Sequence, residues 1–226
     1  MHVTPDQTVL WQGGILHLNA TMVYTWCVMA LLTVGSHLIV RNLSHSDERR
    51  SRWQNAVEVI IEALRGQIRE ICPQGGDTYL PFVGTLFLFI AASNLLDVVP
   101  GWHAPTGSLS TTAALAICVG VAVPLFGIQS QGLVTYFRHY LRPTFIMLPF
   151  HLLSETSRNL ALAVRLFGNI MSGSMIVGIL LAIAPLFFPL LMQALGLLTG
   201  MIQAYIFAVL AMVYIAAAVQ RGQEEV

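Results

Sequence analysis

The stretch NLALAVRLFGNIMSGS, residues 159–174, opens the part of the chain that decides its fold. It begins a tract, residues 159–220, in which Arg165 is the one formally charged side chain. Because one membrane crossing needs about 20 apolar residues, the tract is long enough for two. Pro185 and Pro189 interrupt it near the middle, where we expect a turn. The tract therefore predicts two transmembrane helices joined by a turn.

The position of Arg165 is open to two interpretations. A charge at the centre of a membrane helix costs about 2.5–3.5 kcal/mol on insertion scales, and a cost of that size usually marks a function. Residues 166–184, however, could cross the membrane upright by themselves. Arg165 would then be an anchor that snorkels to the membrane surface.

The neighbours of Arg165 favour a function, because an anchor does not need polar residues in the apolar part of its helix. Helical spacing places five residues on one face: Arg158, Leu162, Arg165, Asn169 and Ser172. Small residues of the same segment would let another backbone approach closely: Ala161, Ala163, Gly168, Gly173 and Gly178.

The composition is that of a membrane protein. Apolar residues make up 56% of the chain and charged residues 10%, with a mean hydropathy of +0.71, whereas a soluble domain carries about 25% charge. The formal net charge is zero, so nothing indicates a nucleic-acid partner. Cys27, Cys72 and Cys118 lie in or beside apolar runs and predict buried thiols, not a disulfide framework or a metal site.

We expect an all-α integral membrane protein that forms a single membrane domain, residues 1–226, with about five transmembrane helices. Residues 1–20 lack the pattern of a cleavable signal peptide and are expected to form the extracytoplasmic N-terminus. The expected spans are residues 21–40, 79–99, 108–127, a fourth from 144 or 149 to 184, and 186–220. Residues 47–72 predict an amphipathic helix on the cytoplasmic surface. Its apolar stripe comprises Trp53, Val57, Ile60, Ile61, Leu64 and Ile68.

The arginines predict the orientation of the spans. Residues 41–52 contain four arginines, and Arg138 and Arg142 follow the third span, whereas residues 100–107 contain none. Because loops rich in arginine stay in the cytoplasm, we expect the N-terminus outside and the C-terminus inside.

The last two spans are longer than a membrane is thick. The fourth would measure about 54–60 Å at 1.5 Å per residue, against a hydrocarbon core of about 30 Å. We therefore expect both helices to tilt strongly. The polar or small residues Gly196, Gly200 and Gln203 fall near one face of the fifth span. Gly196 and Gly200 also form a GxxxG pair that packing between helices would explain by itself.

Several of these segments together resemble subunit a of F-type ATP synthases, and this chain is identified as a divergent bacterial member of that family. The resemblance is strongest in ALAVRLFGN (residues 161–169) and GMIQAYIF (200–207), and it extends over about residues 78–218. Further matches are FIAASNLLD (89–97), APT (104–106) and TTAAL (111–115).

The resemblance implies a role in the membrane sector, F0, of a rotary motor. Subunit a is the non-catalytic stator of that motor, and its two long tilted helices curve against a ring of c subunits. Two half-channels bring ions to and from a carboxylate on each c subunit, which couples proton translocation, or alternatively Na⁺ translocation, to ATP synthesis or hydrolysis. The implied location is the bacterial inner membrane, with b-type peripheral stalk subunits and the lipid bilayer as further partners. No cofactor, metal or catalytic residue is implied.

The resemblance also implies which residues take part in ion translocation. Arg165 would face the ring, attract each incoming carboxylate and prevent ions from passing directly between the half-channels. Asn169, Gln203 and Tyr214 match polar positions of the last two helices, although hydrogen bonds between helices would also account for them. The remaining candidates at the two channel entrances are Asn94, Asp97, Ser108, Ser110, Glu155 and Arg158. Asp97 could equally be a charge at the membrane edge, and Glu155 and Arg158 a surface ion pair.

The chain departs from the family pattern at two positions. Many members carry an ionisable residue where this chain has Ser174 and Gly196. A hydroxyl group and an open backbone can still hold water or coordinate Na⁺, so the departure leaves the transported ion open.

Two other classes of function were considered. An ion-coupled carrier usually shows an internal repeat, and none is detectable here. An intramembrane enzyme needs acidic, histidine or serine groups at membrane depth, and residues 159–220 contain no acid and no histidine.

Overall fold

The computed structural model describes residues 9–13, 16–41, 52–73, 75–99, 101–133, 147–183 and 187–220. Helices dominate these residues, which confirms the all-α membrane class. The arginine-rich loops, residues 42–51 and 134–146, lie outside the described residues. The elements are β1 (Val9–Gly13), β2 (Leu16–Asn19), α1 (Ala20–Arg41), α2 (Arg52–Ile71), η3 (Gly76–Thr78), α3 (Leu80–Leu96), η4 (Pro105–Gly107), α4 (Leu109–Gln131), α6 (Met147–Ile183) and α7 (Phe188–Gln220).

Four of the described helices, α1, α4, α6 and α7, are long and apolar enough to cross a membrane. They coincide with four of the expected spans. The helix α3 is also apolar, but it has 17 residues, about 26 Å at 1.5 Å per residue, which is at the lower limit for a crossing. The 37 residues of α6 and the 33 of α7 correspond to about 56 and 50 Å, well beyond the membrane core.

The N-terminal segment contains a feature that the sequence analysis missed. The strands β1 and β2 pair antiparallel, with Trp11 opposite Leu18 and Gly13 opposite Leu16. No strand was expected from the sequence at these residues. The signal was the Gly13-Gly14 pair between two short apolar runs, a sequence typical of a tight hairpin turn.

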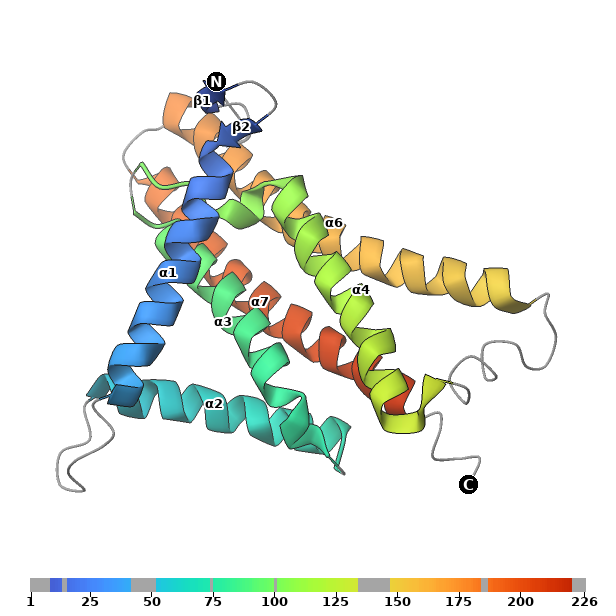
Figure 1. Cartoon of the computed structure of the whole chain (residues 1–226). Coiled ribbons are helices and arrows are strands. Elements are labelled where there is room, and N and C mark those ends of the chain that lie inside the picture. Colours follow the sequence, from blue (N-terminus) through green and yellow to red (C-terminus); the bar gives the residue numbers. More distant parts are fainter. Residues whose placement is uncertain are drawn as a thin grey trace.

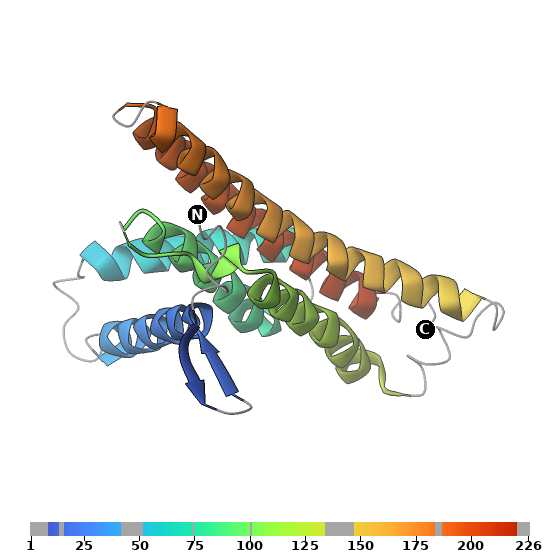
Figure 2. The ribbon, with the colours of Figure 1, turned by 90° about the horizontal axis from the view of Figure 1, so that it is seen from above.

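The helix α7 is the centre of the packing. It contacts α3, α4 and α6, and Figures 1 and 2 show it between these helices, with α6 alongside it. Its buried residues recur every three or four positions and include five small ones, Gly200, Ala204, Ala208, Ala211 and Ala216. Small side chains let neighbouring helices approach closely, which explains why this helix is so extensively covered.

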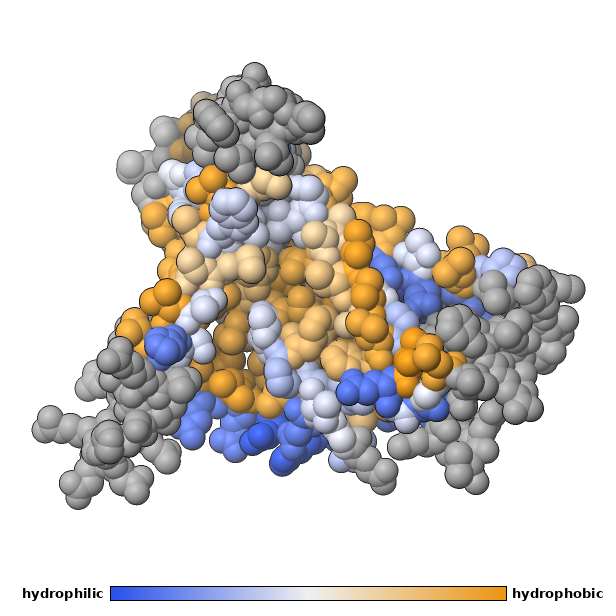
Figure 3. Space-filling view, in the orientation of Figure 1, coloured by the Kyte–Doolittle hydropathy of each residue, from blue (hydrophilic) through white to orange (hydrophobic). Residues whose placement is uncertain are grey.

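The helix α2 runs across one end of the bundle (Figure 1). Leu64 and Ile68 of its predicted stripe are buried, whereas Ile60 and Ile61 stay about two-fifths exposed, at 39% and 40%. The side chain of Trp53 lies outside the described part of the chain. Figure 3 shows hydrophilic residues gathered at this end of the molecule, below a largely apolar surface. This arrangement fits a helix at the boundary between membrane and water.

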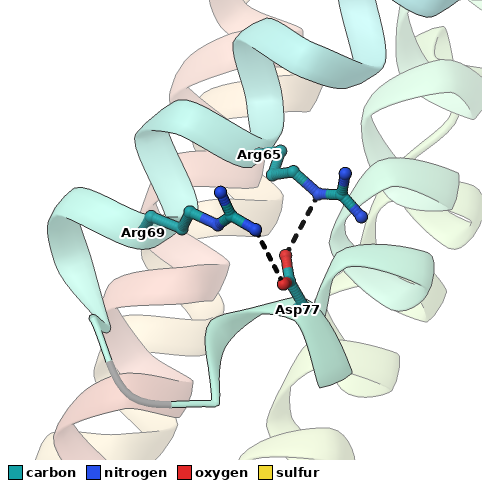
Figure 4. A network of polar contacts seen from close by, with 3 residues as sticks. All are labelled: Arg65, Arg69 and Asp77. Carbon is teal, nitrogen blue, oxygen red and sulfur yellow. Dashed lines mark hydrogen bonds and ion pairs between the residues drawn. The ribbon is translucent and has the colours of Figure 1, made fainter.

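Polar contacts fasten α2 to its surroundings. Asp77 of η3 accepts hydrogen bonds from Arg65 Nε at 3.1 Å and Arg69 Nη2 at 3.0 Å (Figure 4). The Tyr205 hydroxyl of α7 donates to Gln67 Oε1 at 2.7 Å. The turn after α2 and the helix α7 therefore hold α2 in place at two points along its length.

The cysteines only partly match their prediction. Cys72 is buried, but Cys27 and Cys118 are exposed on α1 and α4. An apolar residue of a membrane helix can face lipid as readily as protein, so apolar surroundings in sequence do not determine which side chains are buried.

Candidate functional site

Arg165 lies on the exposed side of α6. The residues Leu162 and Leu166 near it are 1% and 0% exposed and belong to the packed side of the helix, whereas the adjacent Val164 is 51% exposed. Among the residues that the structure describes, no carboxylate pairs with Arg165. Within the described part of the chain the guanidinium group is thus a cation without an ion partner, set in an apolar outer surface.

The residues of the polar stripe predicted around Arg165 differ in how far they are buried. Leu162 is fully buried, Arg158 and Asn169 are half-buried, and Ser172 is exposed. The hydroxyl groups of Ser172 and Ser174 donate to carbonyl oxygens of their own helix, at 3.2 and 3.0 Å. These serines therefore add little polarity to the surface beyond their own backbone.

The small residues of α6 leave room on the outside of this chain. A Cβ atom at Gly168, Gly173 or Gly178 would meet no described atom within 4 Å. Gly196 of α7 is likewise open. The close approach that the small residues predict is therefore not made by the described helices of this chain at these four positions.

A buried polar cluster lies between α3, η4 and α7, and Asn94 is at its centre. The Asn94 side-chain amide donates to the Gly200 carbonyl at 2.7 Å, and the Thr106 hydroxyl donates to Asn94 Oδ1 at 3.1 Å. Asn94 is 3% exposed and Thr106 is completely buried. A Cβ at Gly200 would lie 3.1–3.2 Å from Asn94 atoms. Gly200 is therefore the member of the GxxxG pair that makes a close contact.

Gln203 lies one turn beyond Gly200 on α7 and is 7% exposed. Its Nε2 is buried without a hydrogen-bond partner among the described residues. A buried donor of this kind costs about 1–3 kcal/mol unless water or another group satisfies it. The structure buries Gln203 inside the chain, away from the exposed side on which Arg165 lies, because the close packing of α7 covers that face.

The turn between α3 and α4 contains the remaining outer candidates. Asp97 ends α3 and accepts a hydrogen bond from the Ala104 backbone at 3.0 Å. Ser108 is completely buried, and its hydroxyl is 2.7 Å from that of the exposed Ser110. Ser108 precedes α4 as its cap residue, but its side chain makes no capping hydrogen bond.

Arg158 and Tyr214 meet between α6 and α7. The guanidinium carbon of Arg158 lies 5.0 Å from the centre of the Tyr214 ring, a cation–π contact. Both residues are half-buried, as is Glu155 one turn earlier on α6. The sequence analysis named all three residues but did not foresee that the cation and the ring belong together, because they are far apart in the sequence.

Sequence reasoning also missed two residues of the site. Thr106 stood inside the matching APT segment without a role, and its hydroxyl turns out to bond Asn94. Gln131, at the end of α4, donates to the carbonyls of Ala218 and Val219 at 2.7 and 2.9 Å. A polar residue at the end of an apolar helix was the available signal, but its partner depends on the tertiary structure.

Comparisons with known proteins agree on one family. The model of the ATP synthase A chain family matches residues 22–216. An ATP synthase subunit a 2 from Acaryochloris marina is 62% identical over 99% of this chain and 95% of its own length. The ATP synthase subunit a of Albidiferax ferrireducens is 60% identical over 99% of this chain and 96% of its own length. An ATP synthase subunit a 1 of Chlorobaculum parvum is 60% identical, covering 99% of both chains. This chain therefore belongs to the ATP synthase subunit a family, the ion-transporting membrane subunits of the F0 sector.

Proposed function

We propose that this chain is the stator of the F0 rotary motor and couples proton translocation through a c-ring to ATP synthesis or hydrolysis. It would act without catalysing a reaction itself, in a bacterial inner membrane, next to the c-ring and b-type peripheral stalk subunits. The observation that carries the proposal is the exposed Arg165, which has no carboxylate partner among the described residues and lies on an apolar surface.

An unpaired charge in a membrane is energetically costly. Such a charge is stable when an opposite charge comes close, and a c subunit would supply a carboxylate. The guanidinium group stabilises the ionised carboxylate, lowers its pKa and so promotes release of the bound ion. Arginine suits this role because it stays charged even when water is removed. Each ion that crosses gains about 2.3 kcal/mol per 100 mV of membrane potential.

The two polar regions support two separate ion paths. On the outer path we place Asn94, Asp97, Ser108, Ser110 and Gln203, with Ser174 and Gly196. On the inner path we place Glu155, Arg158 and Tyr214. Asn169, one turn beyond Arg165, lies between them. The buried Gln203 donor supports water in the outer path, because a water molecule would satisfy it.

Sodium ion is a second candidate for the transported ion. In the outer region the groups with described contacts are mostly neutral oxygens and amides, of Asn94, Thr106 and Ser108, and Asp97 is the acidic one. Neutral oxygen atoms are suitable ligands for a hard cation, whereas a proton path uses titratable groups or water.

Replacement of Arg165 tests the stator role. In vesicles that contain the whole complex, we expect Arg165→Ala to abolish ATP-driven ion pumping while the complex still assembles. Arg165→Lys should also fail, since a desolvated lysine can lose its proton. Val164→Ala, at an exposed neighbour, is the matched control and should pump normally. Full coupled transport by Arg165→Ala would reduce Arg165 to an interfacial anchor.

The transported ion is tested in the same vesicles by following ATP-driven acidification and radioactive Na⁺ uptake in parallel. A proton motor acidifies the vesicle interior without added Na⁺ and loses all transport when a protonophore is present. Na⁺ uptake that persists or rises with the protonophore would replace the proton with Na⁺ in this proposal.

A further inference from the structure

The helix α6 contacts α4, α7 and η4, and its contacts with α4 and η4 include one short stripe. Four residues, Asn159, Ala163, Leu166 and Ile170, recur at helical spacing and so share one face. Ala163 and Leu166 are 3% and 0% exposed, and the two outer members are half-buried. On either side of the stripe α6 is largely exposed, as at Leu153 with 67% and Ile179 with 58%. The stripe therefore helps to determine how α6 sits, together with the contacts that α6 makes with α7.

A glycine faces each end of this stripe. A Cβ atom built at Gly120 of α4 would lie 3.0 Å from Asn159 Cγ, and closer still to Asn159 Nδ2. A Cβ atom at Gly107 of η4 would lie 3.2 Å from Ile170 Cγ2. Any other residue at Gly120 would therefore displace the Asn159 side chain or push α4 and α6 apart.

The position of the stripe also decides where Arg165 points. At 3.6 residues per turn, Arg165 lies about 120° around the helix from Asn159. A rotation or outward shift of α6 at the stripe would move the guanidinium group by a comparable amount. Arg165 is six positions after Asn159 and five before Ile170, between the two glycine contacts.

We propose that Gly120 and Gly107 are positioning residues for Arg165. These glycines let α4 and η4 approach α6 closely, so that Asn159 packs against Gly120 and Ile170 packs against Gly107. This packing helps to fix the depth and direction of the Arg165 side chain. This inference rests on the proposed function of Arg165. The part that concerns the packing of α4 on α6 can be tested without that function.

A compensating pair of substitutions tests the proposal. A Cβ at Gly120 has its three nearest neighbours in the Asn159 amide, the third at 3.5 Å, so removing that amide with Asn159→Ala makes room for Gly120→Ala. We expect Gly120→Ala alone to lower ATP-driven ion pumping about tenfold, since ~1 Å of misplacement can cost a factor of about 100. Asn159→Ala alone should lower pumping less than Gly120→Ala does, and the double variant should recover most of the loss caused by Gly120→Ala. Gly84→Ala in α3, where a Cβ meets no atom within 4 Å, is the matched control.

A distance measurement tests the packing of α4 on α6 independently of the function of Arg165. Spin labels at Ile117 of α4 and Leu160 of α6, both 63% exposed, report the separation of the helices in the assembled complex. We expect the separation to increase in Gly120→Ala and to return in the double variant. If Gly120→Ala fails to accumulate, the double variant must restore its accumulation. An unchanged separation with normal pumping, or no recovery in the double variant, would overturn the proposal, whereas pumping by Arg165→Ala would overturn only the stator role.

Discussion

At the scale of single residues, the polar side chains of this chain differ in what they contact. Arg165 is exposed and without an ion partner in the described chain, whereas Asn94 makes two buried hydrogen bonds that join α3 to α7 and η4. Asn94 thus holds the outer part of α7 in place, in addition to any contact with an ion. Substitution of Arg165 should therefore affect the interaction with a partner, whereas substitution of Asn94 should affect the stability of the fold.

Replacing Asn94 should therefore weaken the structure as well as transport. Asn94→Ala removes the donor to the Gly200 carbonyl and leaves the buried Thr106 hydroxyl without its acceptor, a loss of about 1–3 kcal/mol. The measurement is the temperature at which the purified complex releases this subunit. Ser93→Ala is the control, because Ser93 is equally buried but bonds the Phe89 carbonyl of its own helix. An equal effect of both substitutions would show that Asn94 is not a special link.

At the scale of elements, α2 depends on charge at its end and on apolar contact along its length. Asp77 lies between Arg65 and Arg69 (Figure 4), and the hydrogen bond from Arg69, with the positive charge of both arginines, lowers the pKa of its carboxyl group. A lowered pKa means that the folded arrangement is favoured by the ionised carboxylate. The stabilisation is present above the pKa of the unfolded chain and is lost as the pH falls through the folded value.

We therefore expect α2 to loosen from η3 in acid. The ordinary pKa of an aspartate is about 3.9, so the change should occur below about pH 4. Mobility of a spin label at Glu62, on the exposed side of α2, would report it. In Asp77→Asn the mobility should be high already at neutral pH and should change little on acidification. A label whose mobility has the same pH dependence in both proteins would contradict this role of Asp77.

The outer surface of α6 is largely uncovered by the described residues of this chain. A Cβ at Gly168 or Gly173 would meet no described atom within 4 Å, and Arg165 has no ion partner among the described residues, so we expect another protein on this surface. A cysteine at the half-buried Asn169 should crosslink to the carboxylate-bearing helix of a c subunit. A cysteine at Gln203 should crosslink poorly, because that side chain is buried within the chain. Labelling of Asn169 by a lipid-phase reagent without a crosslink would place lipid on this face instead.

At the scale of the whole molecule, four of the described helices are long and apolar enough to cross a membrane, and α3 is a shorter apolar helix. With α3 as a short fifth span, the chain would begin outside and end in the cytoplasm, and α2 would lie on the cytoplasmic surface. Figure 1 supports this arrangement, since α2 lies at the end of the bundle opposite β1 and β2. The obliquely placed α6 and α7 in the same view support the tilt expected from their length.

Labelling from the two sides of the membrane tests this topology. Single cysteines at Thr4 and Gln223, in a background without the three natural cysteines, should react with an impermeant reagent from opposite sides. Intact cells should label only the first, and inverted vesicles only the second. Labelling of both from the same side would remove α3 from the list of crossings.

The sequence by itself determined the membrane class, the approximate limits of the long helices and the family, because these depend on local properties. Hydropathy and length identify a span wherever it packs, and the segments around Arg165 and Gln203 are recognisable without any contact. What only the tertiary structure decided is which side chains meet: Asn94 with Gly200, Arg158 with Tyr214, and Asn159 with Gly120. In an apolar helix hydropathy does not distinguish a face toward lipid from a face toward protein. The burial of Gln203 and the exposure of Arg165 therefore depend on the close packing of α7 and the glycine contacts of α6, between residues far apart in the chain.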